Sequence, residues 1–313
     1  MRERLTLNDR PEAASSKSTT GMKRLMDSVV VLDLTFHRPS IHRKANIQLV
    51  ETEADKKMLG LTKALVTSKE YSNVCRVATD VRAWIERRAL PSPLKRGTYL
   101  ISLELVPDVY EYLDKAEADY KAAAEEFLDA YPERVEEARE KLADQFDPEN
   151  YPTVKELRPA FWLERRMLDF GVPSPNKIGK AFWSKEKKRA EQTWAKATDE
   201  IQEALRSAFR SLVGHLAERL EPKADGTKKT FRDSAITKLL EFIDLFKNRN
   251  LTGDIELEGL VIQARDVLKG KGGAALRKSA PLRGEVAGEM SRVLGALDEL
   301  LENAPRRKIS FDD

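Results

Sequence analysis

The stretch from residue 106 to residue 146 limits what this chain can fold into more than any other part of the sequence. Apolar and small side chains recur along it at steps of three and four residues, at Val109, Leu113, Ala116, Tyr120, Ala123, Phe127, Tyr131, Val135, Ala138, Leu142 and Phe146. This spacing predicts one apolar stripe on a long helix, whose other face is rich in charged residues and suits solvent. A helix of that length spans roughly 60 Å, so its stripe must be covered by another long helix or by a partner chain.

A second stretch of similar length predicts the covering helix. From Ser184 to Leu220 apolar residues again keep helical spacing, and prolines cluster in the segment between the two stretches. Matched lengths joined by a proline-rich turn favour an antiparallel hairpin over residues 107–222, in which each helix covers the stripe of the other. Pro132 interrupts the first stretch, where a proline costs roughly 3 kcal/mol, so we expect either a kink or a new helix start there.

The part before the hairpin predicts a small α/β head. Residues 28–36 have a β-branched start and then alternate, and residues 97–106 also alternate apolar with polar side chains, so we expect two strands. Between these strands, Ser68 can cap a helix over residues 69–88. The first 27 residues are polar and lack periodicity, which indicates a mobile leader.

The part after the hairpin predicts three further helices. Thr230 with Asp233 resembles a capping box, while Asp254 and Ser279 can cap the second and third helices. The predicted fold is therefore mainly α, an elongated long-helix hairpin or bundle with a small α/β head that contains two strands. The expected parts are a mobile leader (1–27), the head (28–106), the hairpin (107–222), a C-terminal helical part (223–304) and a tail (305–313).

Composition and charge exclude several classes of protein. The chain has 313 residues and a net charge of +3, from 55 basic and 52 acidic residues, so any anion binding must come from a local patch. Its single cysteine excludes an internal disulfide framework, and the absence of an apolar run of about 18 residues predicts no integral membrane span. We therefore expect a cytoplasmic protein.

No pattern in the sequence indicates catalysis, a metal or a cofactor. The three histidines lack the ligand spacing of metal sites. The segments at 226–230 and 270–273 combine glycine and lysine, but they lack the spacing of a phosphate-binding loop and follow no strand. Paired acids such as Glu125 and Glu126 fall on the charged side of a helix, where they suit solvent. We therefore predict that the protein is not an enzyme and needs no cofactor.

The segment most suggestive of binding runs from Leu157 to Trp194. It holds three of the four tryptophans and a dense run of basic residues. Basic side chains release counterions from a phosphate backbone, and exposed aromatic rings can stack on bases. The candidate nucleic-acid-binding residues are Lys177, Lys180, Trp183, Lys185, Lys187, Lys188, Arg189 and Trp194. The alternative is that the aromatics close the end of a helical hairpin while the lysines stay solvated.

Several segments between Ser28 and Ile309 occur in a familiar order. They are the strand SVVVLDLTF, the helical segments KAAAEEFLDAYPERVEEA, FRDSAITKLLEFIDLF and IELEGLVIQARDVL, and the basic PRRKI. In this order the chain resembles the bacterial and phage family catalogued as domain of unknown function 3150. Members of that family tend to lie in phage and mobile-element gene clusters, beside genes for MoxR-type AAA+ ATPases, von Willebrand A-type proteins or recombination proteins. The resemblance implies a partner role and brings no catalytic residues.

Three functions follow as hypotheses. The first is a non-enzymatic interaction or scaffold protein of a phage or mobile-element system, which acts with an AAA+ ATPase of the MoxR type, with a von Willebrand A-type protein or as a homo-oligomer. The second is a nucleic-acid-binding accessory factor in replication or recombination, which binds DNA or RNA. The third is a helical pore-forming protein, and the absence of a long apolar hairpin argues against it.

Overall fold

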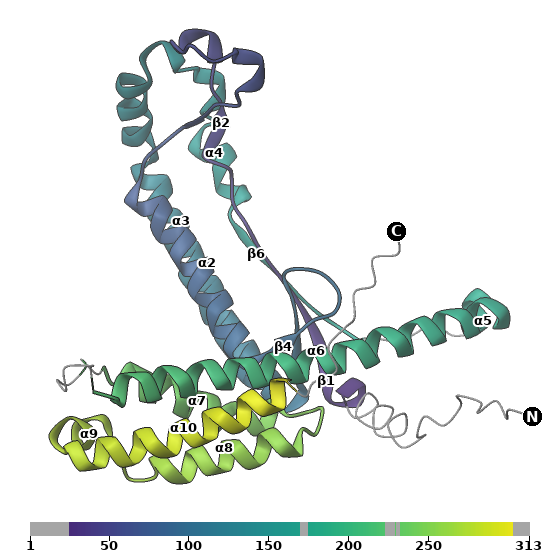
Figure 1. The fold of residues 1–313 in the computed structure, drawn as a ribbon. Helices are drawn as coiled ribbons and strands as arrows, with labels where there is room; N and C mark the ends of the chain where they lie inside the picture. The colour runs from purple at the N-terminus through teal and green to yellow at the C-terminus, as the bar shows by residue number, and fades with distance from the viewer. Residues whose placement is uncertain (1–24, 170–174, 223–228, 230–231, 303–313) are drawn as a thin grey trace, which may run out of the picture.

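The computed structural model describes residues 25–169, 175–222, 229 and 232–302, and it has two arms that meet at an angle (Figure 1). The fold is mainly α with a small antiparallel sheet, as the sequence predicts. The first arm holds the sheet and two long helices, and the second arm is a bundle of helices. None of the described helices has a stretch apolar enough to cross a lipid bilayer.

The first arm is built on two antiparallel helices, α2 (Lys69–Arg88) and α3 (Val106–Leu142). The predicted cap of α2 is confirmed, because the Ser68 hydroxyl accepts a hydrogen bond from the Tyr71 amide at 3.0 Å. The stripe of α3 is buried against α2, the sheet and short elements near the tip of the arm. Its buried members are Val109, Leu113, Ala116, Tyr120, Ala123, Ala124, Phe127, Leu128, Tyr131 and Ala138.

Pro132 lies inside α3 and starts no new helix, although a new start was one of two expectations. Tyr131 and Ala138 are buried on either side of it. Packing on both sides therefore outweighs the loss of one backbone hydrogen bond. The short elements near the tip of the arm are η1 (Ile47–Leu49), η2 (Lys56–Met58), η4 (Ala143–Gln145), η5 (Pro148–Asn150), α4 (Val154–Leu157), η6 (Arg158–Ala160) and a β2–β3 pair (His42–Lys44 and Thr62–Ala64).

The sheet has the antiparallel order β4-β5-β1-β6. The two predicted strands are present as β1 (Val29–His37) and β5 (Thr98–Ser102), although the end of the second prediction is wrong, because residues 103–105 form the 3-10 helix η3 (Leu103–Leu105). The strand β4 (Leu90–Pro91) extends the sheet beyond β5. The strand β6 (Trp162–Leu168) was missed, because its segment was interpreted as part of a proline-rich turn. It is free of proline, and it pairs along β1 with Leu34 opposite Arg165.

Alternate side chains of β1 enter two different cores, since successive residues of a strand point to opposite faces. Val29 and Val31 lie in the core of the second arm, whereas Leu32 and Leu34 lie in the core of the first. The sheet therefore joins the two arms. Leu25, which falls in the predicted mobile leader, is fully buried in the second arm's core, so the leader prediction is wrong for residues 25–27. The rest of that leader lies outside the described residues.

The second arm is organised by α6 (Lys180–Leu220), preceded by the short α5 (Pro175–Ile178). It also contains α7 (Ser234–Arg249), α8 (Ile255–Leu268), α9 (Gly273–Lys278) and α10 (Ala280–Glu302). The predicted caps at Asp254 and Ser279 are confirmed, as each side chain accepts a hydrogen bond from a backbone amide three residues later, at 3.1 and 3.3 Å. Thr230 of the expected capping box lies outside the described residues.

The predicted hairpin of the two long helices is wrong. The helix α3 packs along α2, while α6 packs along α10, and the two stripes belong to separate cores. The reason is β6, which carries the chain from the tip of the first arm back to its base (Figure 1). In Figure 1 the helix α6 runs past this base, away from most of α3, and its stripe is covered by the C-terminal helices.

Candidate nucleic-acid interface

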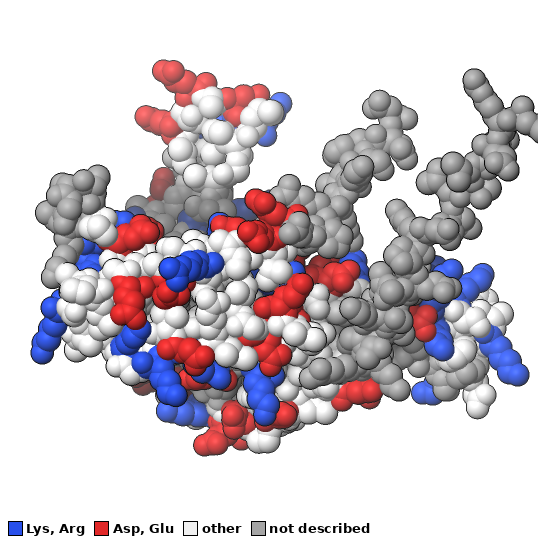
Figure 2. Space-filling model, turned by 60° about the horizontal axis from the view of Figure 1, so that its bottom comes forward, with Lys and Arg blue, Asp and Glu red and all other residues white. Residues whose placement is uncertain are grey.

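The candidate interface is a helical projection, residues 175–193, which we call the spur. It consists of α5 and the first turns of α6, and it extends beyond the helices α7 to α10 (Figure 1). The spur contains six basic and two acidic residues, a net charge of +4. The whole chain has a net charge of +3, so all other residues together sum to −1. Figure 2 shows basic side chains gathered at this end of the molecule.

All six basic residues of the spur are exposed to solvent. Two of them form ion pairs on the same helix, Arg189 with Glu186 at 2.7 Å and Lys187 with Glu191 at 3.8 Å. Exposed ion pairs of this kind contribute less than about 1 kcal/mol to stability, so the Lys187 and Arg189 side chains stay available to a more highly charged anion. Within the described residues, Lys185 and Lys188 form no ion pair.

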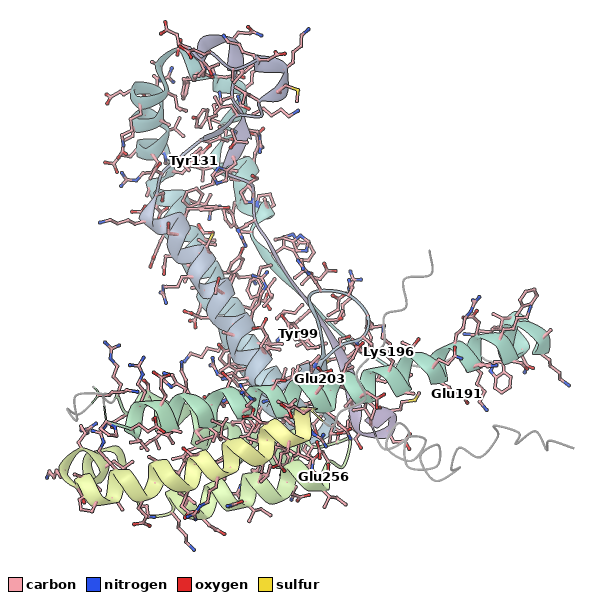
Figure 3. The ribbon with its side chains drawn as sticks, in the orientation of Figure 1. Tyr99, Tyr131, Glu191, Lys196, Glu203 and Glu256 are labelled. Carbon is pink, nitrogen blue, oxygen red and sulfur yellow. The ribbon has the colours of Figure 1, made fainter. Side chains whose placement is uncertain are left out.

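Three basic residues of the spur lie on one face of α6. Lys185, Lys188 and Arg189 are spaced three and four residues apart, which places them side by side on the helix. Lys185 precedes the buried Trp194 by nine residues, or two and a half turns, so this face is opposite the core stripe. Lys196 continues the basic face, and Figure 3 shows it on a different side of α6 from Glu191.

The aromatic candidates have different environments. Trp183 is partly exposed, and the Lys187 ammonium lies 5.2 Å from its ring centroid. Trp194 is only 1 % exposed and packs in the core of the second arm, so its assignment to the binding surface is wrong. Its position in the helical stripe of α6 was the signal that should have excluded it. Phe182, which was not among the candidates, is 67 % exposed on the spur.

The other hollows and side-chain clusters of the described structure are weaker candidates for a functional site. A hollow of about 850 Å³ at the start of α2 is lined by Ser68, Glu70 and Arg134, among others. Two of its charged side chains have partners within the chain, since the Ser68 hydroxyl donates to Glu70 at 2.7 Å and Arg134 contacts Glu137. The hydrogen bond from Ser68 also lowers the pKa of Glu70. Among the described residues, no group of three or more His, Cys, Asp or Glu side chains is placed to hold a metal ion.

Comparison with protein families, with curated proteins and with solved structures found no match to this chain. The resemblance to the family of unknown function described above therefore stays a prediction, as do the partners that it implies.

Proposed function

We propose that this protein binds nucleic acid without catalysing a reaction, and that the spur is the binding element. The observation that carries the proposal is the concentration of positive charge on a projecting helix, in a chain that is otherwise close to neutral. Basic groups that contact phosphates release condensed counterions, and this release supplies affinity that does not depend on base sequence. An accessory role in replication or recombination is consistent with such binding.

The geometry of the spur suits an extended polyanion. Lys185, Lys188 and Arg189 lie on one side of a regular helix, so they can contact neighbouring phosphates of one backbone. Phe182 and Trp183 add exposed ring surface on the same helix. Ring surface of this kind can stack on bases wherever bases are unpaired.

The test is to replace Lys185, Lys187, Lys188 and Arg189 together by glutamine and to titrate labelled single-stranded and duplex DNA by fluorescence anisotropy at several salt concentrations. We expect most of the affinity to be lost. The slope of log affinity against log salt should flatten by up to about 3 for single strands, because each lost phosphate contact removes roughly 0.7.

A matched control separates the spur from the overall charge. Lys238, Lys247, Lys269 and Lys278 are exposed residues of the second arm, and their replacement by glutamine changes the net charge by the same amount. The control variant should keep its affinity. Equal losses in both variants, or unchanged affinity in the spur variant, would show that the spur is not the binding element.

A second candidate function is an interaction or scaffold role, and a different surface favours it. At the tip of the first arm, Met58 is 84 % exposed, and Leu59 and Leu61 beside it are 42 % and 39 % exposed. Apolar side chains that cluster at an exposed position commonly mark a contact with another protein. For this candidate we propose self-association through the tip, since a homo-oligomer was one of the expected assemblies.

A further inference from the structure

One face of the sheet carries an aromatic platform that lies apart from the spur. On β6, Leu163 and Met167 point toward α3 and pack in the first arm's core, so Trp162, Glu164 and Arg166 point to the opposite face. Trp162 is 42 % exposed, and the Arg166 side chain is 63 % exposed. The upper part of this face is therefore open to solvent in the described structure.

Trp162 is held in place by its neighbour on β1. His37 is directly opposite it in the sheet, and the two rings are stacked with centroids 3.8 Å apart and planes only 1° apart. The His37 ring is fixed in turn, since its Nε2 lies 3.0 Å from a carboxylate oxygen of Glu164. The Tyr120 hydroxyl donates to the backbone carbonyl of His37 at 2.9 Å. Such support means that little side-chain freedom is lost when a ligand binds.

The free face of the Trp162 ring is turned outward. His37 covers the ring from the β1 side, and β6 is the edge strand of the sheet. The other face of the indole ring therefore points away from the sheet toward solvent, which agrees with the exposure of the Trp162 side chain. A flat ring can stack there in continuation of the His37–Trp162 pair, as aromatic platforms on sheets do with bases.

We propose that this platform stacks an unpaired base, so that the protein binds single-stranded nucleic acid in preference to duplex. The inference rests on the proposed function and names its substrate class. In Figure 1 the sheet forms the side of the first arm that is turned toward the spur. A single strand of nucleic acid can therefore extend from the platform to the basic residues of the spur. Bases of a duplex are already stacked on each other and offer no free ring face to Trp162.

The charges on the platform indicate that the platform and the spur contribute to binding in different ways. Glu164 contacts both His37 and Arg166, and Asp33 pairs with Lys95 at 3.1 Å, so the platform is close to neutral. Stacking on Trp162 should therefore contribute affinity that depends little on salt. The salt-dependent part comes from the spur, so the two elements can be tested separately.

The test uses the full chain and a labelled oligodeoxythymidine of about 20 nucleotides, longer than one site of this kind. Trp162→Leu keeps an apolar cover over His37 but cannot stack. It should weaken binding roughly 5- to 150-fold, with little change in the salt slope. Trp162→Phe keeps a ring and should retain most of the affinity. The wild-type protein should bind duplex more weakly than the single strand, and both variants should bind duplex about as well as the wild type does.

The matched control is Tyr110→Leu. Tyr110 is 46 % exposed, close to the 42 % of Trp162, but it belongs to α3 on the other side of the sheet. Its replacement should leave binding unchanged. Unchanged affinity of Trp162→Leu, or an equal loss in Trp162→Phe, overturns the platform, while the quadruple spur variant decides the proposed function independently. Thermal melting of each variant shows whether a loss of binding reflects unfolding.

Discussion

The ion pair between Arg206 and Asp254 allows a quantitative test of the second arm. The Asp254 side chain is only 2 % exposed and that of Arg206 is 14 % exposed. Two nitrogens of the guanidinium contact the two carboxylate oxygens, at 2.7 and 3.0 Å. The hydrogen bonds to Asp254 raise the pKa of Arg206. Asp254 also caps α8, so the pair ties α6 to the start of that helix.

The two single substitutions should differ in cost because they leave different partners behind. Arg206→Met leaves the Asp254 carboxylate buried with a backbone amide and no cation, which should lower the free energy of unfolding by about 3 to 5 kcal/mol. Asp254→Ser keeps a side-chain cap for α8. Arg206 then retains Glu256 at 3.1 Å and the Leu300 carbonyl at 3.3 Å, so we expect a loss of about 1 to 3 kcal/mol. Glu256 is labelled in Figure 3.

The assay is urea unfolding followed by circular dichroism, with the double variant completing a cycle. The double variant should lose less stability than the sum of the single losses, by about 0.5 to 3 kcal/mol, because the residues contact each other. Arg76→Met serves as the control, since the Arg76–Asp80 pair is 66 % and 61 % exposed and should contribute less than about 1 kcal/mol. If Arg206→Met costs no more than Arg76→Met, the reasoning about burial is refuted.

Two further predictions concern other parts of the molecule. Burial lowers the pKa of Arg249 to about 10, its Nε has no hydrogen-bond partner, and the described residues give it no ion pair. A buried cation without a partner is unfavourable, so Arg249→Met should raise the free energy of unfolding by about 1 to 3 kcal/mol at neutral pH. The unfolded pKa is higher, so the penalty is present below pH 10 and is relieved only as the pH rises further; a loss of stability in urea unfolding would contradict this. At the tip, replacing Met58, Leu59 and Leu61 by serine should reduce the molar mass measured by light scattering to that of a monomer, and a wild-type chain that is already monomeric at high concentration would exclude self-association through this surface.

The sequence predicted the candidate site in part. The dense basic run indicated an exposed surface, and the structure places all six basic residues in solvent on a projecting helix. Trp194 is a wrong candidate, because its closeness to lysines suggests binding whereas its place in the helical stripe puts it in the core. The His37–Trp162 stack could not be predicted, because the two residues are far apart in sequence and meet only through the pairing of β1 with β6.

The sequence by itself determined the longer helices, their caps at Ser68, Asp254 and Ser279, and the strands β1 and β5, but not the short helix α9. These features depend on contacts between residues a few positions apart, so periodicity and capping side chains are sufficient to indicate them. Only the tertiary structure decided which helices pair and which segment completes the sheet. An apolar stripe can be covered by any helix of suitable length, so the sequence pattern does not specify that α3 packs on α2 and α6 on α10. The pairing of β6 with β1 sets these partners, because it returns the chain to the base of the first arm.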